Sequence, residues 1–216
     1  LELCSLESQL PLSRFDLVGF TLQYELSYTN LLHMLRLGGI PLRQEERGEK
    51  DPFIIAGGPC AYNPEPLADF LDAVVLGDGE EVILEIVEEY RLHRKEGGSR
   101  RDYLKRLAGI EGVYVPSFFT ATYHEDGRFK EVRPLIKGYT AVTRRVVEDL
   151  DSAPYPTAPV VPFMEIVHDR LTVEVARGCA RGCRFCHAGS VYRPVRERTP
   201  STVKEILRRS LEKTGY

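Results

Sequence analysis

Phe53-Ile-Ile-Ala-Gly-Gly-Pro59 is a short apolar run that stops at two glycines and a proline. Runs of this length and composition are typical of a strand buried on both faces of a parallel sheet. Phe15–Thr21 upstream and Ala73–Gly77 downstream have the same apolar character. The sequence therefore predicts at least three buried strands in the first half of the chain.

Helical patterns alternate with these strands. Tyr28–Leu37 is predicted as a helix with Leu31, Met34 and Leu35 on one apolar face. Glu80–Lys95 repeats the helical spacing more clearly, after the third strand. Alternation of strands and helices predicts an α/β fold with an open, mostly parallel sheet of Rossmann type.

Glycines follow two of the predicted strands. In open α/β sheets, the loops at the carboxyl ends of the strands line the ligand crevice. Because glycine has no Cβ, a ligand can approach the backbone closely at these positions. We therefore take four glycines as candidate ligand-binding residues: Gly57, Gly58, Gly77 and Gly79.

The pattern changes after the second long helix. Asp102–Ala108 is a short helix candidate, and Ser117–Tyr123 and Phe129–Val132 alternate around a turn, which predicts a β-hairpin. Four prolines in 151–162 predict an extended linker. The predicted parts are an α/β domain, a β-rich connecting region and a second module, at residues 1–96, 97–162 and 163–216.

The second module contains a cysteine-rich loop, Arg177-Gly-Cys-Ala-Arg-Gly-Cys-Arg-Phe-Cys-His187. A strand is predicted before it at Leu171–Val175, and a helix after it over Val203–Leu211, with Thr199-Pro200 at its start. The spacing Cys-x3-Cys-x2-Cys places three thiolates on one short loop. Three thiolates are a ligand set for a soft metal or an iron–sulfur cluster.

Alternative sites differ in the ligands that they need. A zinc knuckle requires a fourth ligand such as His187, and zinc sites usually have a second ligand pair further along. An electron-transfer cluster requires a fourth cysteine, and Cys4 and Cys60 lack a suitable spacing. Three protein ligands with one open position favour a catalytic cluster that binds a substrate at the metal.

Composition places limits on the class of protein. Five cysteines, three of them clustered, indicate metal chemistry in a reducing compartment, and no leader segment is recognised, so the expected location is the cytoplasm. No apolar run has the roughly 18 residues of a membrane span. Residues 177–216 hold ten basic and three acidic residues, a net charge of +7. Because the whole chain has a net charge of −3, residues 1–176 have a net charge of −10. The basic zone favours an anionic cluster, ligand or nucleic acid.

The cysteine spacing, with Phe185 before the last cysteine and a predicted strand before the first, resembles the signature of the radical S-adenosylmethionine (SAM) superfamily. Glu174–Cys179 and Tyr192–Arg198 are similar to one branch, whose members carry an amino-terminal cobalamin-binding-like domain. The resemblance extends to Phe15–Tyr90, and covers the connecting region only loosely.

The resemblance implies specific cofactors and roles. Cys179, Cys183 and Cys186 would each bind one iron of a four-iron, four-sulfur cluster, and SAM would bind the fourth iron. A reductant of flavodoxin or ferredoxin type would trigger cleavage of SAM to a deoxyadenosyl radical, which abstracts hydrogen from an unknown substrate such as RNA or a protein. Phe185 would contact the adenine, or alternatively pack within the loop. Arg177 and Arg181 would support anionic ligands, or alternatively be solvated.

Two features depart from the family pattern. A barrel of six βα units needs on the order of 180 residues, and only the first unit is recognised here, so we expect a longer active protein and an inactive fragment. The Asp-x-His-x-x-Gly motif that supplies a cobalamin ligand is absent, and neither His33 nor His93 has its context. Cobalamin binding and a vestigial packing domain both remain open, as does a non-catalytic module with a structural zinc loop.

Overall fold

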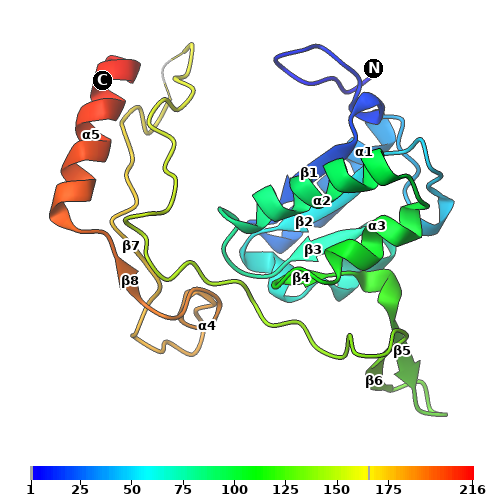
Figure 1. Ribbon diagram of the computed structural model, residues 1–216. Helices are drawn as coiled ribbons and strands as arrows, with labels where there is room; N and C mark the ends of the chain where they lie inside the picture. Colours follow the sequence, from blue (N-terminus) through cyan, green and yellow to red (C-terminus); the bar gives the residue numbers. More distant parts are fainter. Residues whose placement is uncertain (1, 165) are drawn as a thin grey trace. The chain divides into compact units, whose positions relative to one another are not determined.

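The computed structural model describes residues 2–164 and 166–216. The chain forms two compact units, Leu1–Val146 and Val147–Tyr216, which we call the N-terminal and C-terminal units (Figure 1). Within the described residues, no helix has both the length and the apolar character needed to cross a membrane.

The N-terminal unit contains a four-stranded sheet in the order β1-β2-β3-β4. The first three strands, β1 (Leu17–Thr21), β2 (Phe53–Gly57) and β3 (Ala73–Val75), are parallel, and β4 (Val113–Tyr114) pairs antiparallel with β3. The predicted α/β class with an open, mostly parallel sheet is confirmed. The antiparallel edge strand β4 is too short to give a period in the sequence, and it was not predicted.

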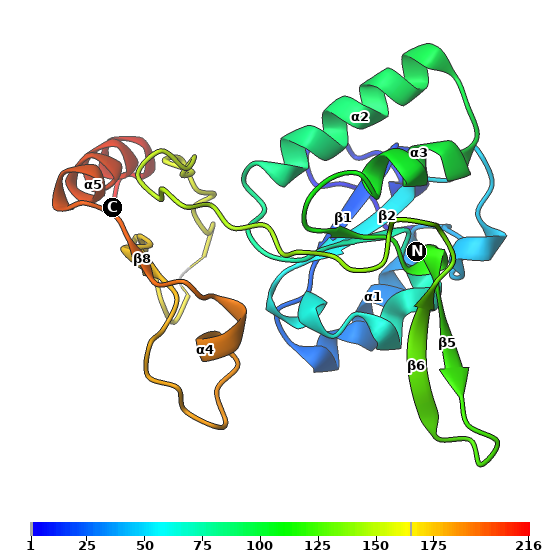
Figure 2. The same ribbon diagram turned by 60° about the horizontal axis from the view of Figure 1, so that its bottom comes forward.

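Helices cover both faces of the sheet (Figure 2). Along β2, Ile54 and Ala56 pack in the cluster that includes α1 (Tyr28–Leu37). Phe53 and Ile55 pack in the cluster under α2 (Val82–Glu96) and α3 (Arg100–Leu107). This division follows from the alternation of side chains along a strand.

Helix α1 has the predicted bounds, but its apolar face is narrower than predicted. Leu31 and Leu35 are buried, while Met34 is 39% exposed.

The N-terminal unit continues well past the predicted boundary at residue 96, because α3 and β4 form part of its core. Short 3-10 turns connect the main elements: η1 (Leu12–Arg14), η2 (Glu25–Ser27), η3 (Gln44–Glu46), η4 (Pro59–Tyr62), η5 (Glu65–Phe70) and η6 (Pro116–Phe118).

The predicted hairpin is present in the N-terminal unit. Strands β5 (Phe119–Tyr123) and β6 (Phe129–Pro134) pair antiparallel, with a register irregularity at Thr122/Tyr123. Every residue of β6 is exposed. The hairpin therefore adds little to the core of the unit.

A buried ionic cluster joins the loop before β2 to the strand β3. The carboxylate of Asp72 accepts hydrogen bonds from Arg47 at 2.8 Å, from Arg100 at 2.8 Å and from the backbone N–H of Ile54 at 2.7 Å. The side chains of Asp72 and Arg47 are both fully buried. The guanidinium of Arg100 also lies 3.9 Å from the ring centre of Phe53. Local sequence patterns did not predict this cluster.

The C-terminal unit has less regular structure. It contains β7 (Ala176–Arg177), α4 (Ala188–Val191), β8 (Arg196–Glu197) and α5 (Pro200–Thr214). The strand predicted at Leu171–Val175 does not form; only the next two residues are a strand, and they pair antiparallel with β8. A strand needs a partner for its backbone groups, and in the described residues the chain supplies one only at β8.

Helix α5 begins as predicted. Thr199 is the N-cap residue and its hydroxyl accepts a hydrogen bond from Thr202 N, while Pro200 occupies the first helical position. Of the predicted apolar face, Ile206 is buried and Leu211 is 43% exposed. The apolar face of α5 is thus only partly covered within the described residues.

The cysteine loop as a candidate metal centre

The three cysteines lie on the single loop between β7 and α4. Cys179 is half-buried, Cys183 and Cys186 are exposed, and all three are free thiols. The backbone N–H of Cys186 donates to the carbonyl of Cys183 at 3.1 Å, which forms a turn at the end of the loop. The loop therefore presents three uncommitted sulfur ligands within eight positions of sequence.

Gly178 fixes the start of the loop. It has φ +103°, and a Cβ at this position would lie 2.7 Å from the carbonyl oxygen of Tyr192 and 2.8 Å from that of Pro194. The backbone before Cys179 thus lies directly against the segment that leads into β8. Gly182, between the first two cysteines, has φ +66° and open space around it.

We expect Gly178→Ala to destabilise the C-terminal unit by about 3 kcal/mol, because the new methyl group meets backbone atoms that cannot move independently. Gly182→Ala is the matched control, with an expected cost of about 1 kcal/mol from its left-handed backbone alone. Amide hydrogen exchange over residues 176–198 measures both effects. Equal protection in the two variants would contradict the role assigned to Gly178.

Three arginines near the loop pair with a carboxylate or donate hydrogen bonds to backbone carbonyls. Arg177 makes a two-bond ion pair with Glu174, with both N–O distances at 2.9 Å. Arg196 donates to the carbonyl of Val147 at 2.5 Å, and Arg198 donates to the carbonyl of Leu150. Arg196 and Arg198 are both buried. The predicted role of Arg177 as a support for a bound anion does not fit this pairing.

The basic zone is therefore largely neutralised or used in structural contacts. On α5, Arg208 pairs with Glu205 and Glu212. Arg181 and Arg184 are exposed, and in the described part of the chain no ion pair is assigned to either of them. The net charge of +7 already subtracts Glu205 and Glu212, and Glu174, which lies outside residues 177–216, offsets the charge of Arg177 in addition.

The donor set fits an iron–sulfur cluster in its chemistry. Within residues 2–164 and 166–216, no three His, Cys, Asp or Glu side chains are gathered closely enough to hold a metal ion. The three thiols are nevertheless free, lie on one loop and are not buried, and thiolates are the ligands that iron–sulfur clusters use. His187, the fourth zinc ligand considered above, is exposed and lies before α4.

Phe185 is 93% exposed and is therefore not a packing residue of the loop in the described structure. An aromatic ring that is open to solvent can receive a planar ligand. This observation favours a ligand contact over the alternative packing role.

Two of the four glycines of the predicted crevice lie against the chain's own backbone. A Cβ on Gly58 would lie 2.9 Å from the carbonyl oxygen of Leu22, and one on Gly77 would lie 2.0 Å from that of Arg145. Gly77 and Arg145 form a parallel bridge at the end of β3. Gly57 is the last residue of β2, and Gly79 has open space around it. At Gly58 and Gly77, the chain's own backbone thus occupies the space that was predicted to receive a ligand.

Cys60 is a core residue. It is 5% exposed and packs with the cluster on the α1 face. Burial raises the pKa of its thiol, and the neighbouring carboxylate of Glu25 raises it further. Since the thiolate is the reactive form, these surroundings fit a small buried packing residue better than a reactive thiol.

Comparison with known proteins gives one family and two relatives. Residues 1–116 match the family model described as "Radical SAM proteins, N-terminal". An uncharacterised protein of Methanocaldococcus jannaschii is 27% identical over 196 residues, covering 89% of this chain and 34% of that protein. The anaerobic magnesium-protoporphyrin IX monomethyl ester cyclase of Cereibacter sphaeroides is 26% identical over 153 residues, covering 68% of this chain and 21% of the cyclase.

The chain thus spans about a third or less of the length of these relatives. The family match ends before the cysteine loop. In contrast, an alignment that covers 89% of the chain includes this loop wherever it begins.

Proposed function

Because the chain belongs to the radical SAM proteins through their N-terminal domain at residues 1–116, we propose that Cys179, Cys183 and Cys186 hold a four-iron, four-sulfur cluster in the longer protein. The single observation that carries the proposal is the presence of three free thiols on one accessible loop. With SAM bound, such a cluster supplies a radical that removes a hydrogen atom from the substrate.

The residues around the loop support this role in different ways. Gly178 and the Glu174–Arg177 pair hold the first part of the loop against the segment before β8. Phe185 leaves its ring open for the adenine of SAM. The buried side chains of Arg196 and Arg198 donate hydrogen bonds to the carbonyls of Val147 and Leu150. These bonds hold β8, the strand that pairs with β7 before the loop, in position.

The substrate and the electron donor are also part of the proposal. A small reductant of flavodoxin or ferredoxin type would supply the electron, with access through the exposed end of the loop at Cys183 and Cys186. An RNA substrate receives less support than the net charge suggested, because Arg177 pairs with Glu174, and Arg196 and Arg198 are buried against backbone carbonyls. A protein-bound or small substrate fits this charge distribution better.

For the N-terminal unit we propose a packing role in preference to cobalamin binding. Gly58 and Gly77 approach the chain's own backbone. Neither His33 nor His93 belongs to a cobalamin-ligand motif. Nδ1 of His33 lies 3.3 Å from the guanidinium of Arg36, and His93 is buried beside the rings of Tyr90 and Tyr103.

Anaerobic reconstitution of the full-length protein with iron and sulfide tests the function. We expect a brown protein with a four-iron content and the release of deoxyadenosine on reduction in the presence of SAM. One zinc with no iron in protein purified without oxygen would instead support the non-catalytic module with a structural zinc loop. Absence of both cluster and deoxyadenosine in the reconstituted protein would overturn the proposal.

A further inference from the structure

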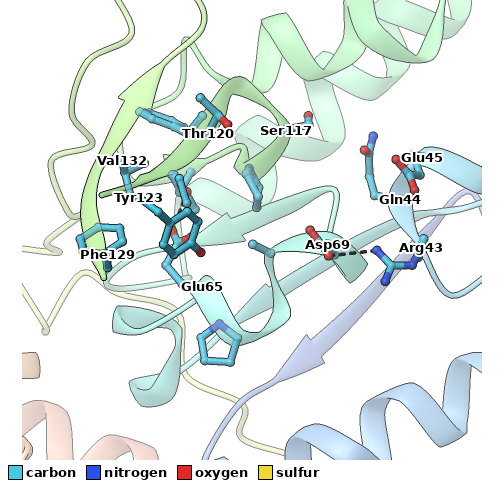
Figure 3. Close-up of a pocket in the computed structure, with 16 residues that line it drawn as sticks. Arg43, Gln44, Glu45, Glu65, Asp69, Ser117, Thr120, Tyr123, Phe129 and Val132 are labelled. Atoms are coloured by element: carbon cyan, nitrogen blue, oxygen red, sulfur yellow. Dashed lines mark hydrogen bonds and ion pairs between the residues drawn. The ribbon is translucent and has the colours of Figure 1, made fainter. Parts of the chain in front are cut away.

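The N-terminal unit has a groove next to the edge strand β4, whose Tyr114 is one of the lining residues. It is a cavity of about 530 Å³ between the β5–β6 hairpin on one side and the turns η3 and η5 on the other (Figure 3). All of its lining residues lie within the N-terminal unit. Its volume is in the range of ligand-binding pockets, roughly 300–1,000 Å³.

The hairpin supplies an apolar wall. Tyr123, Phe129 and Val132 line the groove and are 62%, 58% and 36% exposed. The rings of Tyr123 and Phe129 lie edge to face, with their centres 6.3 Å apart. Apolar side chains that gather on one exposed face in this way are typical of an interaction surface.

The opposite wall and the floor are acidic. Glu45, Glu65 and Asp69 line the groove, and Arg43 is the one basic residue among its lining side chains. Arg43 pairs with Asp69 at 3.0 Å. The groove therefore carries an excess of two negative charges next to a wall of aromatic rings (Figure 3).

Glu65 is held in a defined position. Its carboxylate accepts a hydrogen bond from the hydroxyl of Tyr114 at 2.7 Å. Burial raises the pKa of Tyr114, and the bond to Glu65 raises it further, so that the hydroxyl stays protonated and remains a donor. This bond from the edge strand of the sheet orients the carboxylate of the exposed Glu65.

We propose that this groove binds an extended segment of a partner protein in which lysine or arginine alternates with apolar residues. Apolar side chains would pack on Tyr123 and Phe129, while cationic heads meet the carboxylates and the faces of the rings. A nucleic acid would bring its phosphates against Glu45 and Asp69. A purely apolar segment would bury the carboxylates without a partner. Charge complementarity therefore selects a basic peptide.

The test uses the full-length protein and a short labelled peptide of alternating leucine and lysine, with binding followed by fluorescence anisotropy. We expect saturable binding that weakens as the salt concentration rises. Phe129→Ser is expected to weaken it about tenfold, because the ring is a central contact of the apolar wall. Leu84→Ser on α2 is the matched control, since Leu84 is 67% exposed and lies outside the groove, and it should leave binding unchanged.

The charge requirement is tested separately. Glu45→Lys is expected to weaken binding, whereas Glu88→Lys, at an exposed glutamate of α2, should not. Equal binding of a leucine–glutamate peptide would overturn the charge selection. Stronger binding of a single-stranded oligouridine would overturn the choice of a protein partner. No binding of the basic peptide to the full-length protein would overturn the docking site itself. None of these results depends on the cluster, so they are independent of the proposed function.

Discussion

Cys183→Ala in the full-length protein is expected to abolish cluster binding, with iron and sulfide contents falling to background after anaerobic reconstitution. Each of the three cysteines on the loop supplies one sulfur ligand in the proposed site, so the substitution leaves two of the three thiolates that hold the cluster. Absorbance of the reconstituted protein, with iron analysis, measures the loss. Deoxyadenosine formation is expected to disappear together with the cluster.

The same substitution should leave the fold intact. The side chain of Cys183 is exposed, so its removal is expected to change the free energy of unfolding by no more than about 0.5 kcal/mol. Cys4→Ala and Cys60→Ala are the matched controls, because they remove a cysteine from the N-terminal unit and should keep the full iron content. A Cys183→Ala protein that retains the iron content of the Cys4→Ala protein would show that the loop does not hold the cluster.

Asp72→Asn is expected to lower the free energy of unfolding of the N-terminal unit by about 3–5 kcal/mol. The substitution removes the only carboxylate that pairs with both Arg47 and Arg100 in the described ion pairs. Two guanidinium groups then remain in the protein interior without a counter-charge. Burial already lowers the pKa of Arg47, and the carboxylate of Asp72 opposes this shift. The expected loss is large compared with the total stability of a typical domain, about 5–15 kcal/mol.

Asp69→Asn is the matched control for this effect. Asp69 pairs with Arg43 at 3.0 Å, but the two side chains are 69% and 48% exposed. An exposed ion pair contributes about 0–1 kcal/mol, so the control should unfold almost like the unmodified protein. Because the chain has no tryptophan, urea unfolding is best followed by far-ultraviolet circular dichroism. A loss for Asp72→Asn no larger than that for Asp69→Asn would show that the cluster does not stabilise the unit.

The two units differ in how well local sequence predicts them. Tyr28–Leu37 forms the predicted helix because its own spacing of Leu31 and Leu35 matches the buried face. Leu171–Val175 has an equally clear apolar pattern, yet it does not form a strand in the described structure. A helix satisfies its backbone groups internally, whereas a strand depends on a neighbour that its own sequence does not specify.

The ionic cluster shows a second limit. Asp72 lies inside the run Leu71-Asp-Ala-Val-Val75, and a charge in an otherwise apolar run was a signal that it is buried and paired. Its partners Arg47 and Arg100 are 25 and 28 residues away in the chain. No periodicity connects such positions. The acidic groove under the hairpin was missed for the same reason, since its walls come from separate parts of the N-terminal unit.

The sequence by itself determined the α/β class, the bounds of α1, the start of α5 and the presence of three sulfur ligands on one loop. These features depend on short-range spacing, capping and side-chain chemistry, which are properties of contiguous residues. Tertiary structure alone decided that Gly58 and Gly77 contact the chain's own backbone, that Arg177 pairs with Glu174, and that an aromatic hairpin lies opposite acidic turns. Each of these outcomes depends on which distant segments meet, and that is set by packing of the whole unit.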